Sequence, residues 1–154
     1  MRFILDENVI ICAQTGRNDR RIPDPTCGRL LLGIVHGPHS LAITQAIWGW
    51  YGRQVALIPA SDAVQGVGVM ANLASLFSDA ARGAQFKATP PKLPELVGVK
   101  GTDRAFVELA VDQDDGITLV TTDRRLVAAV NSLGFPDRYG FTVRSPEEAL
   151  SALS

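Results

Sequence analysis

The chain has 154 residues, and its 15 basic and 16 acidic side chains give a net charge of -1. Because these charges nearly cancel, the chain as a whole is not attracted to nucleic acid, and any such binding has to come from a local patch. Hydrophobic residues make up 46% of the chain and charged residues 20%, which is typical of a folded globular protein and not of a disordered one. The length is that of one domain, so we expect a single domain over residues 1–154.

The sequence also indicates where the protein works. It has no run of about 18 apolar residues, the length that a membrane-spanning helix needs. Its N-terminus carries one arginine and then Asp6 and Glu7, which is unlike a secretory signal peptide. We therefore expect a cytoplasmic protein without a membrane partner. Cys12 and Cys27 lack the spacing of a metal or redox motif, so we expect both to be buried thiols.

Strand and helix patterns alternate in the first half of the chain. Residues 2–5 are almost entirely apolar, which is typical of a parallel strand buried on both faces. Asp24 and Pro25 predict a helix start, because aspartate caps helices and proline is favoured in the first turn. Thr44 is a second expected cap, and Gly83 is an expected stop. The expected elements are a strand over 2–5, an exposed loop over 14–22, a helix over 24–36, a strand over 40–44, a helix from 45 and an alanine-rich helix over 62–82.

The second half of the chain continues the alternation. Thr102 is expected to cap a helix in which Asp103 shares a face with apolar residues. Ser145 and Glu148 form a capping-box pattern. The expected elements are a loop over 88–101, a helix from 103, a turn over 113–116, a strand over 117–121, a helix over 124–133, a strand over 141–143 and a helix from 146. The alternation predicts an α/β fold, a three-layer sandwich with a central, mostly parallel sheet flanked by helices.

Three aspartates are the candidate chemical groups. Asp6 and Asp123 follow two expected strands, and the carboxyl ends of parallel strands form the edge of an α/β sheet where ligands bind. Asp103 lies on the apolar face of its helix, 20 residues before Asp123. Carboxylates that meet at one edge repel one another unless a cation or a proton separates them. Oxygen ligands of this kind suit Mg²⁺ or Mn²⁺, and such an ion activates water and neutralises charge on a phosphate.

Three stretches of the chain resemble the PIN domain. They are residues 3–10 (FILDENVI), 103–110 (DRAFVELA) and 119–126 (LVTTDRRL), and the resemblance covers essentially the whole chain in order and length. It implies a Mg²⁺- or Mn²⁺-dependent ribonuclease, a fold that is often the toxin of a bacterial toxin–antitoxin pair. Its partners would be an RNA substrate and an antitoxin protein, and a homodimer stays open.

The resemblance also assigns roles to individual residues. Asp6, Asp103 and Asp123 match the metal-binding, catalytic positions. Asn8 matches the asparagine two residues after the first aspartate, and Thr121 matches the threonine before the last one. Asn8 lies on the same side of an extended chain as Asp6, where it would orient that carboxylate or hold a water molecule. A simple turn residue is the alternative interpretation of Asn8.

The chain departs from the PIN pattern at one acidic position. PIN nucleases usually carry a glutamate five or six residues after a serine or threonine in the helix that follows the second strand, and counting from Thr44 gives Gly49 or Trp50 here. Glu7 or Asp24 would have to replace it. In an extended strand Glu7 faces away from the first aspartate, although a bend at the strand end would swing it in. The alternative to an active ribonuclease is therefore a catalytically impaired PIN-like module that binds RNA or a protein partner.

Arginines are the candidate contacts to RNA. Arg124 and Arg125 stand at the start of the helix after the last aspartate, and Arg17, Arg20 and Arg21 lie in the expected exposed loop. Side chains of this kind bind the phosphates of nucleic acids. The sequence therefore predicts a local basic patch beside the sheet edge, although solvated surface charge is the simpler interpretation of each arginine.

Two other features bear on function. An aspartate-based phosphotransfer domain would need a second acid two residues after Asp6, where Asn8 stands, and a lysine after a late strand, which the chain lacks. We therefore rank phosphotransfer below the two PIN-like hypotheses. Trp48, Trp50 and Tyr51 are neighbours on one expected helix and cannot all be core. An exposed member would stack on a base or pack against a partner, and the interpretation we favour is partial burial against the alanine-rich helix.

Overall fold

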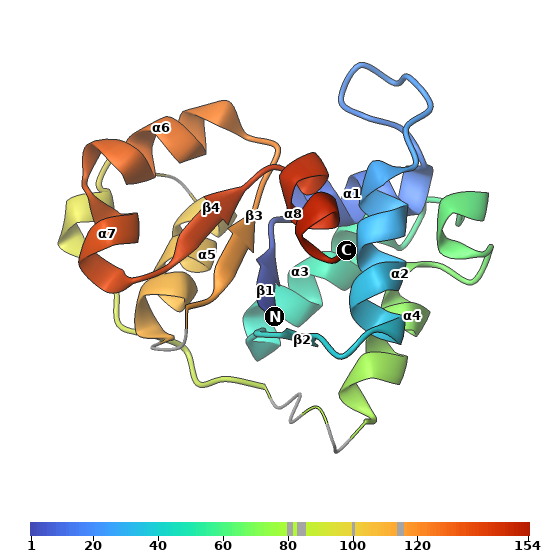
Figure 1. Cartoon of the computed structure of the whole chain (residues 1–154), viewed down its shortest axis with the longest axis horizontal. Coiled ribbons are helices and arrows are strands. Elements are labelled where there is room, and N and C mark those ends of the chain that lie inside the picture. The colour runs from blue at the N-terminus through green and yellow to red at the C-terminus, as the bar shows by residue number, and fades with distance from the viewer. Residues whose placement is uncertain (80–81, 83–85, 100, 114–115) are drawn as a thin grey trace.

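A parallel β-sheet forms the centre of the molecule, which confirms the predicted α/β fold. The computed structural model describes residues 1–79, 82, 86–99, 101–113 and 116–154 (Figure 1). Within these residues the sheet has four strands in the order β2-β1-β3-β4. The strands are β1 (Arg2–Leu5), β2 (Ser40–Leu41), β3 (Thr118–Val120) and β4 (Thr142–Arg144). Phe3, Ile4 and Leu5 of β1 are fully buried, as the apolar run at this place predicts.

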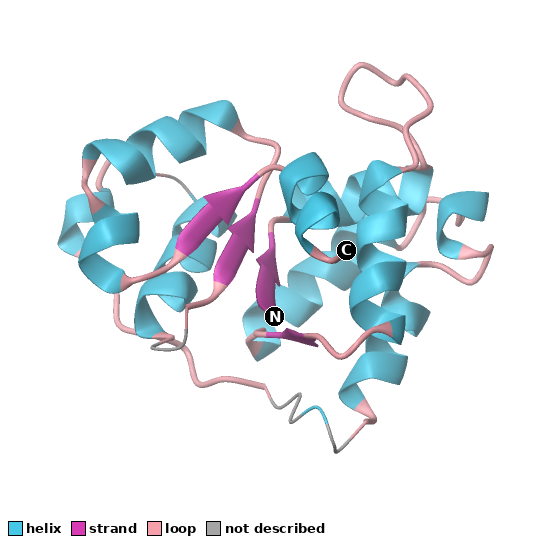
Figure 2. Ribbon diagram, in the orientation of Figure 1, coloured by secondary structure: helices cyan, strands magenta, loops and turns pink. Residues whose placement is uncertain are grey.

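Helices cover both faces of the sheet and give the predicted three layers (Figure 2). On one face α8 contacts β3 and β4, and on the other α5 contacts β1 and β3. Helix α2 packs against α8 and α1, and α3 packs against α1. The helices are α1 (Glu7–Thr15), α2 (Thr26–His36), α3 (Gln45–Val55), α4 (Val69–Phe77), α5 (Gly101–Asp112), α6 (Arg124–Ser132), α7 (Phe135–Tyr139) and α8 (Pro146–Ala152), with short 3-10 turns η1 (Asp62–Val64) and η3 (Pro94–Leu96).

Three helices begin at the same edge of the sheet. Helix α1 follows β1, α6 follows β3 and α8 follows β4, each after a short connection, so their N-termini lie at the carboxyl ends of the strands (Figure 1). The long loop between α1 and α2 projects beside this edge in the same view. The edge therefore collects helix N-termini and a loop, the arrangement in which open α/β sheets bind ligands.

Several predicted helix ends are confirmed by their hydrogen bonds. Thr44 caps α3 and accepts from the N–H of Ile47 at 3.2 Å. Ser145 and Glu148 form the predicted capping box, in which each side chain accepts from the other residue's backbone N–H, both at 3.2 Å. The caps of α3 and α8 were predictable because they depend on neighbouring residues alone. At α2 the prediction is off by one residue, because Pro25 is the cap and Asp24 before it accepts from the N–H of Thr26.

The predicted helix over 62–82 is wrong. In the described part of this region η1 and α4 are separate elements, and α4 ends at Phe77. Gly66 and Gly68 between them have φ angles of +70° and +91°, which no α-helix contains. The expected stop at Gly83 lies outside the described residues. Tertiary contact decides where α4 starts, because Oε1 of Gln14 accepts from the N–H of Val69 at 2.9 Å.

Other boundaries differ in smaller ways. The second strand is shorter than the predicted 40–44, and α7 was not predicted because its five residues lie between Gly134 and Gly140, both in the left-handed region. Thr102 is not a cap but the second residue of α5. Half of the expected turn over 113–116 lies outside the described residues. Cys12 and Cys27 are buried free thiols, as expected.

Candidate active site

Asp6 is buried at the carboxyl end of the central strand. It follows β1 and caps α1, with an extended backbone at φ -61° and ψ 151°. Its Oδ1 accepts from the N–H of Asn8 at 3.4 Å, and its Oδ2 accepts from the hydroxyl of Thr121 at 2.5 Å. The side chain is 0% exposed. Because α1 begins directly after Asp6, the carboxylate of Asp6 is buried at the N-terminus of this helix.

Thr121 connects two strand ends. It follows β3, is buried, and donates to Asp6 while its hydroxyl oxygen accepts from the N–H of Asp123 at 3.0 Å. The N–H of Asp6 in turn donates to the carbonyl of Val120 at 2.9 Å. One hydroxyl therefore fixes Asp6 relative to Asp123 across the β1–β3 pair. The predicted supporting position of Thr121 is thus placed next to both aspartates.

Asp103 lies on the first turn of α5. With Asp6, Asp123 and Glu7 it forms a cluster of carboxylates, which we call the acidic group. Its side chain is half-buried, and within the described part of the chain it has no hydrogen-bond partner. The pKa of its carboxyl is raised, first by burial and then by the negative charges of Asp123 and Glu7. Phe106, on the same helix face, is fully buried. The face that the sequence predicted to point inward therefore carries Asp103 to the sheet edge.

Asp123 is the N-cap of helix α6. Its Oδ1 accepts from the N–H groups of Arg125 and Leu126 at 2.9 and 3.3 Å, at the start of α6. The side chain is partly exposed, and its charge still reaches Asp103. The structure therefore shows Asp123 as a helix cap near Asp103, and its role as a site residue stays a prediction.

The environment of Asp6 favours a neutral carboxyl. Burial is the largest cause, and the charges of Asp103 and Glu7 add to it, which together raise the pKa of Asp6 to about 6. The hydrogen bonds from Thr121 and from the N–H of Asn8 act in the opposite direction. A carboxyl that is buried beside other carboxyls becomes an anion readily only when positive charge is brought near it.

Glu7 belongs to this group although the alternation of an extended strand places it on the other side. Helix α1 begins at Glu7, so strand geometry no longer applies to it. Its Oε1 accepts from the hydroxyl of Thr102 at 2.9 Å, and its Oε2 is buried without a hydrogen-bond partner among the described residues. Asp24, the other acid considered for this place, lies just before α2 and accepts from the N–H of Thr26 instead.

Helix α3 contributes a buried tyrosine next to the end of β1. Tyr51 is fully buried and its hydroxyl donates to the carbonyl of Leu5, one residue before Asp6. Burial, followed by the charges of Asp6 and Glu7, raises the pKa of Tyr51 well above its ordinary value. Sequence reasoning missed this contact, and its only signal was the apolar spacing of Ile47, Tyr51 and Val55, which marks a buried helix face. Trp48 and Trp50 are partly buried beside the core.

The donor chemistry of the group fits a hard divalent cation. All its potential ligands are carboxylate oxygens, and the buried, unpartnered Oε2 of Glu7 is the kind of atom that a cation would satisfy. Among the described residues, however, no three side chains of histidine, cysteine, aspartate or glutamate are grouped closely enough to hold a metal ion as they stand. Binding would therefore draw the carboxylates together.

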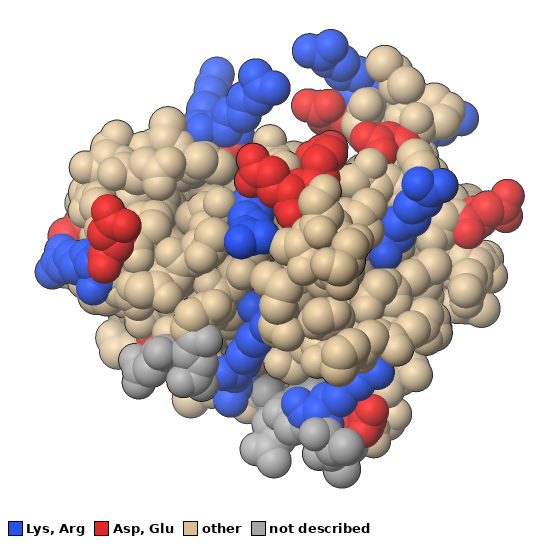
Figure 3. Space-filling view, viewed as in Figure 1, with Lys and Arg blue, Asp and Glu red and all other residues tan. Residues whose placement is uncertain are grey.

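A basic cleft borders the acidic group. It has a volume of about 1270 Å³, and Asn8, Thr121 and Asp123 are part of its lining, whereas Asp6 and Asp103 are not. All the arginines predicted to contact RNA line it together with one more: Arg17, Arg20, Arg21, Arg124, Arg125 and Arg144. Acidic side chains also border it, and Figure 3 shows basic side chains on either side of acidic ones at this edge of the molecule.

The loop that carries three of these arginines is held in shape by its own hydrogen bonds. Oδ1 of Asn18 accepts from the N–H groups of Arg20 and Ile22 at 3.0 and 3.1 Å. Nη1 of Arg17 donates to the carbonyl of Arg21 at 2.9 Å, and Arg17 and Pro23 form an antiparallel bridge. The guanidinium of Arg17 is therefore partly engaged in a hydrogen bond within the loop.

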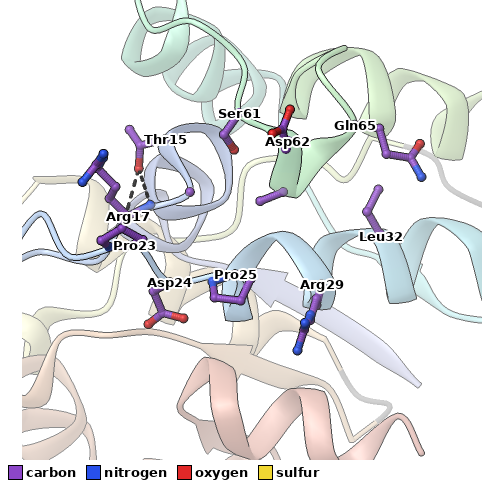
Figure 4. Close-up of a pocket in the computed structure, with 12 residues that line it drawn as sticks. Thr15, Arg17, Pro23, Asp24, Pro25, Arg29, Leu32, Ser61, Asp62 and Gln65 are labelled. Atoms are coloured by element: carbon purple, nitrogen blue, oxygen red, sulfur yellow. Dashed lines mark hydrogen bonds between the residues drawn. The ribbon is translucent and has the colours of Figure 1, made fainter.

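A smaller pocket lies behind this loop (Figure 4). Its volume is about 760 Å³, and Thr15, Arg17, Asp24, Arg29 and Asp62 contribute polar groups to its lining. The hydroxyl of Thr15 is hydrogen-bonded to the backbone of Arg17. The pocket contains none of the aspartates predicted to hold a metal, so it is separate from the acidic group.

Comparison with protein-family models, with curated proteins and with solved structures finds no match to this chain. The PIN-domain resemblance therefore stays a prediction. Within the described residues, no helix is both long enough and apolar enough to cross a membrane.

Proposed function

We propose that the chain is a PIN-like, metal-dependent phosphodiesterase that hydrolyses RNA. The observation that supports it most is the link at the sheet edge, where the hydroxyl of Thr121 connects Asp6 to Asp123 and the charge of Asp123 reaches Asp103. Carboxylates from two neighbouring strands and one helix are thus collected beside an arginine-lined cleft. A site for hydrolysis of a phosphodiester needs both components.

The residues would divide the work between metal and substrate. Asp6, Asp103 and Asp123 would hold Mg²⁺ or Mn²⁺, which when bound activates a water molecule and offsets charge on the scissile phosphate. Thr121 orients Asp6 through its hydrogen bond. Asn8 is exposed and lines the cleft, so its amide is placed to contact substrate or a water molecule. By its resemblance, the proposal extends to a cytoplasmic toxin that an antitoxin protein holds inactive, and it leaves a homodimer open.

The proposal is tested by incubating the purified protein with mixed-sequence single-stranded RNA and Mn²⁺. We expect cleavage that stops when a chelator is added and resumes when Mn²⁺ is restored. Cleavage that persists in the chelator would exclude a metal mechanism. RNA binding without cleavage in Mn²⁺ or Mg²⁺ would favour the second candidate instead.

That second candidate is a PIN-like module that binds RNA or a protein without turnover. The observation in its favour is that Oδ1 of Asp123 is engaged in capping α6, while Gly49 and Trp50 stand where an acid is usual. The two candidates predict the same cleft but different behaviour toward metal. Titration with Mn²⁺ separates them, because a module without a metal site gives no heat of binding at millimolar ion.

Arginines on both sides of the cleft should set the salt dependence of RNA binding. In a protein that carries Asp103→Asn to prevent cleavage, we expect Arg20→Ala and Arg125→Ala each to weaken binding. Each should lower the slope of log affinity against log salt by about 0.7, the value for one phosphate contact to a single strand. Fluorescence anisotropy over a range of salt concentrations measures the slope.

The matched control is Arg53→Ala. Arg53 is also exposed on a helix, but it does not line the cleft. Its replacement should leave both affinity and slope unchanged. Equal effects of all three replacements would show that the cleft has no special role in binding.

A further inference from the structure

Glu7 carries a carboxylate oxygen that nothing in the described structure explains. Oε1 is held by the hydroxyl of Thr102 at 2.9 Å, whereas Oε2 is buried and lacks any hydrogen-bond donor among the described residues. A buried oxygen of an ionisable group without a partner costs free energy and is rare in folded proteins. The side chain is therefore held in place by one oxygen while the other is left for a missing partner.

The neighbours of this oxygen make a cation the fitting partner. The charge of Glu7 acts on Asp6 and on Asp103, so it lies near both carboxyls. A fourth acid beside them increases the repulsion of the group unless positive charge is bound there. The hydroxyl of Tyr51, the nearest buried hydroxyl from α3, donates to the carbonyl of Leu5 and is not available to Glu7.

The position of Glu7 follows from where β1 ends. Asp6 caps α1 and Glu7 is the first residue of that helix, so the strand alternation that would place the two carboxylates on opposite faces does not apply to them. Thr102, on the first turn of α5, donates its hydroxyl to Glu7. The contact joins residues 95 positions apart, so it reflects the tertiary fold and not a local preference.

We propose that Glu7 supplies the fourth carboxylate of the metal site, in place of the acid that is missing at Gly49 or Trp50, and that Thr102 positions it. The inference depends on the proposed metal-dependent function. It assigns the role to a residue next to Asp6 in sequence, so one turn of chain at the end of β1 would provide two ligands. Thr102 acts only through Glu7 and is a positioning residue.

The test is Mn²⁺ binding measured by isothermal titration calorimetry, which needs no substrate. We expect Glu7→Gln to weaken Mn²⁺ binding by at least about tenfold, and Thr102→Val to weaken it by about ten- to a hundredfold, as for other residues that orient a ligand. The control is Glu147→Gln, which removes an equal charge from an exposed residue of the neighbouring cleft and should leave the affinity unchanged.

A thermal melt in chelator gives a second readout. Because Glu7→Gln removes one like charge from the acidic group and keeps the oxygen that accepts from Thr102, the metal-free variant should melt no lower than the unaltered protein, while its gain in Tm with Mn²⁺ should shrink. If Glu7 served only to hold α5 through Thr102, Thr102→Val would melt lower, and both variants would keep their Mn²⁺ affinity.

The outcomes separate this inference from the proposed function. No Mn²⁺ binding by the unaltered protein would overturn both. Binding that Asp103→Asn removes but Glu7→Gln and Thr102→Val leave intact would overturn the role of Glu7 alone. If Glu7→Gln did not fold, the Thr102→Val titration would still decide, since unchanged affinity contradicts the proposal.

Discussion

Asp103→Asn should remove Mn²⁺-dependent RNA cleavage and leave the fold intact. The side chain is half-buried on the first turn of α5 and has no hydrogen-bond partner among the described residues, so asparagine fits without breaking a contact. It removes one charge from the proposed metal site. Since a catalytic ion contributes several kcal/mol to stabilising the transition state, we expect the initial rate to fall by at least about a hundredfold.

The rate should be measured on single-stranded RNA with saturating Mn²⁺, and circular dichroism should confirm the fold. Asp112→Asn is the control, because Asp112 is an exposed aspartate at the other end of the same helix. It should cleave like the unaltered protein. If both variants cleaved at the same rate, Asp103 would not be part of the active site.

Asp6→Asn should stabilise the metal-free protein at neutral and alkaline pH, although it removes a proposed ligand. The pKa of Asp6 is raised in the folded protein to about 6 from 3.8, so folding favours the protonated form. Stability from this group is fully present below pH 4 and is lost as the pH rises through 6. The difference corresponds to about 3 kcal/mol at pH 8, which an uncharged asparagine would not lose.

Urea unfolding in chelator at pH 4 and pH 8 measures this effect. The free energy of unfolding of the variant should exceed that of the unaltered protein at pH 8 and approach it at pH 4. Asparagine is itself a good helix cap, so loss of the cap on α1 does not obscure the comparison. If the free energies of unfolding of the two proteins changed in parallel between pH 4 and pH 8, folding would not raise the pKa of Asp6.

Local sequence patterns predicted most of the layers but not all of the boundaries. The apolar run of β1, the cap at Thr44 and the capping box at Ser145 are confirmed, because each depends on residues adjacent in the chain. The helix over 62–82 failed because the composition around Gly66 and Gly68 favours helix only on average. Gly68 lies against the side chain of Gln14 in α1, which also accepts from the N–H of Val69, and a local pattern does not contain such contacts.

Part of the candidate site was also predictable from the sequence. Asp6, Thr121 and Asp123 follow strands that pair in the sheet, so parallel topology alone brought them together. Glu7 was harder, since its direction depends on the one residue at which β1 becomes α1. The contact between Glu7 and Thr102 was not predictable, because Thr102 was expected to cap α5 and instead donates a hydrogen bond to a residue of α1.

The loop of Arg17, Arg20 and Arg21 has a thermodynamic consequence for the proposed RNA binding. Its turns are closed by hydrogen bonds to the side chain of Asn18 and by the bridge between Arg17 and Pro23. Ordering one residue of a flexible segment costs about 1–2 kcal/mol in backbone entropy. Because folding has already ordered this loop, an RNA strand that entered the cleft would bind arginines on a preorganised loop. The affinity would therefore be lowered little by the entropy of ordering the loop.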